Sequence, residues 1–83
     1  MTPGELVQTP LLESLTPAER LVAIHVVEGL SDKEIACLLG KALSTVKHQV
    51  SAILRVSGAE SRTRFIAAYY RQFLVPLGEK VGT

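Results

Sequence analysis

The chain has no tryptophan, one cysteine and four aromatic residues, all of them between Phe65 and Phe73. A single cysteine excludes an intramolecular disulfide and is typical of a reducing compartment. With only two histidines besides, the sequence offers too few ligands for a structural zinc site. Hydrophobic residues nevertheless make up 47% of the 83 residues, which argues against intrinsic disorder. We therefore expect one small folded domain without a metal or cofactor.

Long apolar runs are also missing. No run approaches the roughly 18 residues of a transmembrane helix. The first five residues lack the basic and apolar regions of a signal peptide. These absences predict a cytoplasmic protein that does not bind a membrane.

The net charge of +1 hides an uneven distribution. Residues 1–40 carry two basic against six acidic residues, a net charge of −4. Residues 41–64 carry five basic residues against one acidic residue, a net charge of +4. A basic segment of this kind suits a polyanion such as DNA, but it is equally compatible with an ordinary solvated face.

Helix-start signals recur along the chain, whereas no segment shows the alternation of apolar and polar residues that is typical of a strand. Thr16 with Glu19, and Ser31 with Glu34, have the spacing of two capping boxes. Gly29, Gly40 and Gly58 are suited to end helices. The sequence thus predicts an all-α domain of four short helices, at about 17–28, 32–39, 43–56 and 62–74. The ordered domain is expected over 15–74, after a leader or linker (1–14, with a short helical turn near 11–14) and before a flexible tail (75–83).

The helix expected at 43–56 has two different faces. Val46, Val50 and Ile53 form an apolar stripe. The opposite stripe is polar and basic, and consists of Ser44, Lys47, His48, Ser51 and Arg55. With the helix expected at 32–39 it has the layout of a helix-turn-helix, whose second helix enters the DNA major groove. Small and polar side chains near its start allow the backbone to approach base edges.

Phosphate contacts are expected beside this face. Arg55, further along the same helix, is placed to meet phosphate. Lys33 and Arg62 lie at expected helix N-termini, where free backbone N–H groups favour an anion. For Arg62, a structural capping role is the alternative.

A set of short motifs extends in uninterrupted register over about 15–73. They are Leu15-Thr16-Pro17-Ala18-Glu19-Arg20, Glu28-Gly29-Leu30-Ser31-Asp32-Lys33-Glu34-Ile35-Ala36, Leu39-Gly40, Thr45-Val46-Lys47, Val50-Ser51, Ile53-Leu54 and Ser61-Arg62-Thr63. Together they resemble the LuxR-type helix-turn-helix domain of bacterial transcription regulators. The resemblance implies four helices, of which the last commonly dimerises. It also implies base contacts by Lys47, His48 and Ser51, phosphate contacts by Thr45 and Arg62, and a backbone contact by Lys33.

The sequence departs from that family at several positions. Lys41 and Ala42 stand where a β-branched residue and a Ser or Thr are usual, so the start of the helix is expected to shift towards Ser44. Histidine stands at position 48, with Gln49 where the family often has histidine. Apolar residues replace usual polar ones and predict extra apolar surface, at Leu21, Ile24, Cys37, Leu38 and Leu43.

The last expected helix carries more large apolar residues than one face can bury in so small a domain. We therefore expect a homodimer interface there, built from Phe65, Tyr69 and Phe73, with ordinary core packing as the alternative.

Two functions remain in competition. The first is a sequence-specific DNA-binding transcriptional regulator that binds double-stranded DNA as a homodimer, with residues 43–56 in the major groove. The second is a protein-interaction module on the same scaffold with weak or no DNA binding, for which RNA polymerase is a candidate partner. No arrangement of a nucleophile with a base and an orienting group is present, so an enzyme is not expected.

Overall fold

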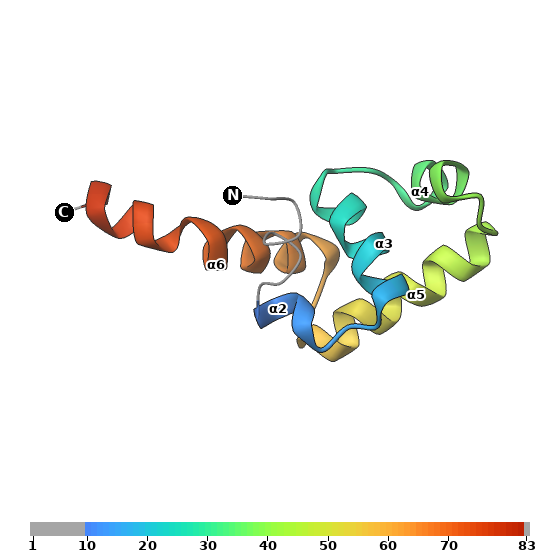
Figure 1. Ribbon diagram of the computed structural model, residues 1–83, viewed down its shortest axis with the longest axis horizontal. Helices are drawn as coiled ribbons and strands as arrows, with labels where there is room; N and C mark the ends of the chain where they lie inside the picture. Colours follow the sequence, from blue (N-terminus) through green and yellow to red (C-terminus); the bar gives the residue numbers. More distant parts are fainter. Residues whose placement is uncertain (1–9, 83) are drawn as a thin grey trace.

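The computed structural model describes residues 10–82, with the side chains of residues 11–72. These residues form five helices and no strand, which confirms the all-α prediction (Figure 1). The helices are α2 (Pro10–Glu13), α3 (Pro17–Val27), α4 (Asp32–Leu39), α5 (Leu43–Ser57) and α6 (Arg62–Gly82).

Both predicted capping boxes are present. The Thr16 hydroxyl accepts the Glu19 N–H at 3.2 Å, and the Glu19 carboxylate accepts the Thr16 N–H at 3.0 Å. Ser31 and Glu34 repeat the pattern at 3.1 and 2.8 Å. The hydrogen bond from the Ser31 N–H lowers the pKa of Glu34 below its usual value. Each box satisfies backbone donors that a helix start leaves free.

The turn between α4 and α5 depends on Gly40. Its φ of 64° lies in the left-handed region, where a side chain is strained. The Lys41 N–H returns to the Ala36 carbonyl at 2.9 Å and closes the end of α4. Ala42 then takes the N-cap position of α5 without a side-chain hydrogen bond. Because α5 begins at Leu43, the expected shift of its start to Ser44 does not occur.

The core lies where α3 meets the other helices. It contains Val22 and Val26 of α3, Ile35 of α4, Ile53 of α5 and Phe65 of α6, all fully or almost fully buried. α3 contacts α4, α5 and α6. This shared core holds α4 and α5 in a fixed orientation, with one side of each facing solvent.

The structure differs from the expected boundaries at both ends. Leu12, which we assigned to the leader 1–14, is 0% exposed and belongs to the core. α2 packs on α6, and the Leu11 N–H donates to Gln72 Oε1 at 3.0 Å. The short helical turn expected near 11–14 is present as α2. A four-residue helix is too short to show periodicity, so only the packing reveals that it belongs to the core. The rest of the leader, residues 1–9, lies outside the described residues.

The last helix does not end at 74 as predicted, since α6 continues to Gly82. Pro76 removes one backbone hydrogen bond, a local loss that does not end the helix. The expected flexibility of the tail at 75–83 stays a prediction.

Candidate nucleic-acid interface

α4 and α5 form the predicted helix-turn-helix at one end of the molecule (Figure 1). α4 ends at Gly40, and α5 begins after Ala42. Val46, Val50 and Ile53 face inward and are buried. The opposite side of α5 is therefore free to meet a ligand along its length.

Every residue predicted to contact bases is exposed. These residues come from the first half of α5 and consist of Ser44, Lys47, His48 and Ser51. Thr45 and Arg55, predicted to contact phosphate, are also exposed on α5, and so is Lys33 in the first turn of α4. We call Ser44, Lys47, His48 and Ser51 the reading face.

The turn before the reading face carries a contact that sequence reasoning missed. Lys41 Nζ donates to Gln49 Oε1 at 3.1 Å and joins the turn to the second turn of α5. Lys41 and Gln49 were each identified as departures from a family pattern, but their pairing was not foreseen. The signal was the spacing of the two departures, about two helical turns along the chain, with Lys41 just before the helix and Gln49 on it.

Residues 11–55 match the family described as Sigma-70, region 4. The chain belongs to this family. The comparisons with curated proteins and with solved structures found no match. The matched segment covers α2 to α5 almost completely, and it begins at Leu11, next to the buried Leu12 of α2.

Membership in the sigma-70 region 4 family identifies the domain as a DNA-binding helix-turn-helix. Region 4 of sigma factors binds DNA and contacts RNA polymerase. The more specific LuxR-type resemblance extends further, into α6, which the family match does not cover. No helix in the described part of this region 4 domain is long and apolar enough to cross a membrane.

Arg62 does not stand free at a helix N-terminus as predicted. Its guanidinium forms an ion pair with Asp32 and donates to the Leu30 carbonyl at 2.5 Å. Its side chain is 31% exposed. The prediction of a phosphate contact therefore needs correction, because the donors are directed at α4 and its preceding loop. The alternative of a structural role describes the observed geometry.

The aromatic residues of α6 also differ from expectation. Phe65 is 0% exposed and Tyr69 is 6% exposed, because both lie in the core of the region 4 domain. Burial raises the pKa of Tyr69. The interface predicted from these two residues is wrong, since neither offers surface to a partner. The side chain of Phe73 lies outside the described residues.

Among the described aromatic side chains of α6, Tyr70 is the exposed one. Its hydroxyl donates to the Val27 carbonyl at 2.9 Å, and its ring meets Tyr69 edge-to-face with centroids 5.3 Å apart. Tyr70 thus fixes α6 against the end of α3, although 40% of it remains exposed.

The predicted extra apolar surface is confirmed at four of its five positions. Leu21, Leu38 and Leu43 are exposed, and Leu38 is the most exposed of them at 59%. Cys37 is exposed as well. Ile24 is half-buried instead. His25, also half-buried, forms a local hydrogen bond with Glu28, with 2.7 Å between His25 Nδ1 and Glu28 Oε1.

Proposed function

We propose that this region 4 domain binds double-stranded DNA sequence-specifically, with the first half of α5 in the major groove, and regulates transcription. The observation that carries the proposal is the division of α5 into a buried apolar side and an exposed reading face. The major groove is about 12 Å wide and admits one helix whose outward side chains are small or polar.

Each residue of the reading face has a role in the proposal. Lys47 donates to guanine, and His48 donates to or accepts from a base edge. Ser44 and Ser51 are short, so they let the backbone come close while offering hydroxyl groups. Lys33, Thr45 and Arg55 flank the reading face and bind phosphate, which supplies affinity and register. Arg62 is not assigned a phosphate contact because its charge is already neutralised by Asp32.

Further assignments rest on the sequence alone. They are the LuxR family itself, a bacterial and cytoplasmic setting, and a homodimer on two half-sites about one helical turn apart. A homodimer through α6 must use the exposed side of that helix, because Phe65 and Tyr69 are buried.

The test measures fluorescence anisotropy of the full chain with duplex DNA, first with random sequence and then with the selected preferred site. Because several phosphates are contacted, affinity is expected to fall steeply between about 50 and 200 mM salt. We expect Lys47→Ala with His48→Ala to abolish preference for the selected site, since each good base contact contributes about 1–3 kcal/mol.

The matched control is Arg71→Ala, which removes one positive charge from the exposed side of α6. It should leave both affinity and site preference close to wild type. Unchanged preference in the double variant, with its helical circular dichroism intact, would refute the reading face.

A protein-interaction module remains the second candidate function. It is favoured by the exposure of Leu38 and Leu43 on either side of the turn, where a DNA-binding surface is expected to be polar. The salt dependence of binding distinguishes the two functions. An apolar interface keeps its affinity at high salt, whereas phosphate contacts are weakened by screening.

A further inference from the structure

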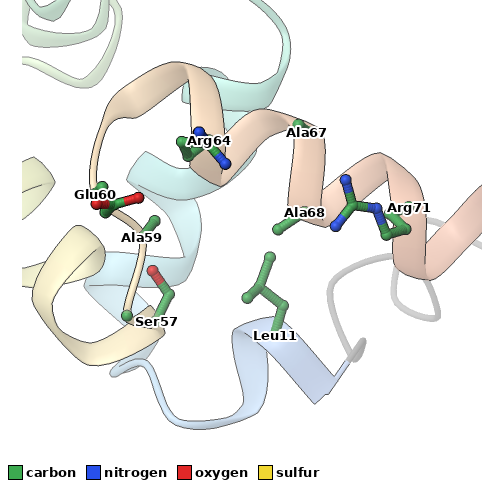
Figure 2. A pocket seen from close by; sticks show the side chains of 9 residues that line it. Leu11, Ser57, Ala59, Glu60, Arg64, Ala67, Ala68 and Arg71 are labelled. Atoms are coloured by element: carbon green, nitrogen blue, oxygen red, sulfur yellow. The ribbon is translucent and has the colours of Figure 1, made fainter.

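A pocket lies between α2, the C-terminal end of α5 and one side of α6. Its volume is about 210 Å³, and its apolar lining includes Leu11, Ala59, Ala67 and Ala68. Figure 2 shows Leu11 reaching from α2 towards Ala68 of α6, with Arg71 beyond Ala68. The small alanines leave this side of α6 open between larger neighbours.

Two arginines of α6 line the same pocket. Arg64 and Arg71 are two helical turns apart and therefore lie on one side of the helix. Both are exposed, and within residues 11–72 neither forms an ion pair. Glu60 lines the pocket at the end away from Arg71, which leaves a net charge of one positive unit around it (Figure 2).

The size of the pocket limits what can occupy it. Sites that enclose small molecules usually measure about 300–1,000 Å³, so 210 Å³ suits one or two side chains of a protein. An arginine binds a carboxylate through two parallel hydrogen bonds, and arginine is enriched at protein interfaces. Charge and size together therefore favour an acidic protein segment.

We propose that this pocket docks an acidic amphipathic helix of a partner protein. Two carboxylates spaced two turns apart on that helix meet Arg64 and Arg71. The apolar side chain between them enters against Leu11 and Ala68. The spacing matches because two α-helices laid side by side have the same rise per residue.

The pocket and the reading face are at different ends of α5. The reading face occupies its first half, whereas the pocket takes Ser57 from its last turn. In Figure 1, α4 and the start of α5 lie at the right end of the molecule, and α2 lies beside the other end of α5. The acidic helix and DNA can therefore bind at the same time, so the domain joins a DNA site to a partner.

The test uses the full chain and a fluorescein-labelled synthetic helical peptide with glutamates two turns apart and a leucine between them. We expect saturable binding that weakens about tenfold or more in Arg64→Gln with Arg71→Gln. The matched control, Lys47→Gln with Arg55→Gln, removes the same charge from α5 and should keep peptide affinity within about twofold. No binding to wild type, or equal weakening in both variants, overturns the proposal.

A second variant tests the apolar part without changing charge. Ala68→Leu fills the space beside Leu11 and is expected to weaken peptide binding while both arginines remain. Circular dichroism confirms the fold of each variant. Peptide affinity unchanged by Ala68→Leu would overturn the proposed entry of an apolar side chain.

Two other occupants are distinguished by further measurements. Displacement of the peptide by duplex DNA would assign the arginines to phosphate and overturn the proposal. Sedimentation of wild type as a dimer and of Arg64→Gln with Arg71→Gln as a monomer would assign the pocket to a second copy, and would equally overturn it.

Discussion

Arg62 joins the start of α6 to the start of α4. One guanidinium binds the Asp32 carboxylate and the Leu30 carbonyl, which are both near the N-cap of α4. Hydrogen bonds from a charged group are stronger than neutral ones, and this pair is only partly exposed. A single side chain thereby sets the position of α6 relative to the helix-turn-helix.

We expect Arg62→Ala to lower the free energy of unfolding by about 1–3 kcal/mol, because Asp32 and the Leu30 carbonyl both lose a charged donor. Asp32→Asn is the matched variant. It keeps the contact of Arg62 with Leu30 and should lower the free energy of unfolding by less than Arg62→Ala does. Urea unfolding measures both. A stable Arg62→Ala variant that binds DNA weakly would instead favour the original prediction of a phosphate contact.

At the scale of elements, the residues at the helix ends decide where most helices of this chain begin. Thr16 and Ser31 each form a complete capping box, so α3 and α4 begin where the sequence predicts. α5 is the exception, since Ala42 contributes no side-chain cap. The helix begins at Leu43 nonetheless, because Val46, Val50 and Ile53 are held in the core.

We therefore expect Ala42→Ser to raise the free energy of unfolding by about 0.5–2 kcal/mol, because it supplies the missing acceptor for a free N–H of α5. Ala67→Ser, at an exposed position inside α6, is the control and should be slightly destabilising. The midpoints of urea unfolding measure both changes. An equal effect of the two substitutions would show that the start of α5 lacks the expected cap geometry.

The whole molecule is held together by contacts between distant parts of the chain. α2 packs on α6, and Leu12 is as completely buried as Phe65. In a domain this small, each fully buried leucine is a substantial part of the total stability. The short helix at the start is thus part of the fold.

We expect Leu12→Ala to lower the free energy of unfolding by about 2–5 kcal/mol, through lost burial and the cavity left behind. Leu38→Ala, at the most exposed of the large apolar positions described, serves as control and should change stability little. Thermal or urea unfolding measures both. A Leu12→Ala variant as stable as wild type would restore the interpretation of residues 1–14 as a leader.

The sequence by itself determined the helices α3 to α5 and the start of α6, the capped starts of α3 and α4, the turn at Gly40 and the exposed side of α5. These features depend on residues within a few positions of each other, so local spacing is enough to predict them. The tertiary structure decided which partner Arg62 takes, that Phe65 and Tyr69 are buried, and that Leu12 belongs to the core. Each of these depends on contacts between segments far apart in the chain. Hydrophobic burial decides which face of a helix packs in the core where the local sequence pattern fits more than one face.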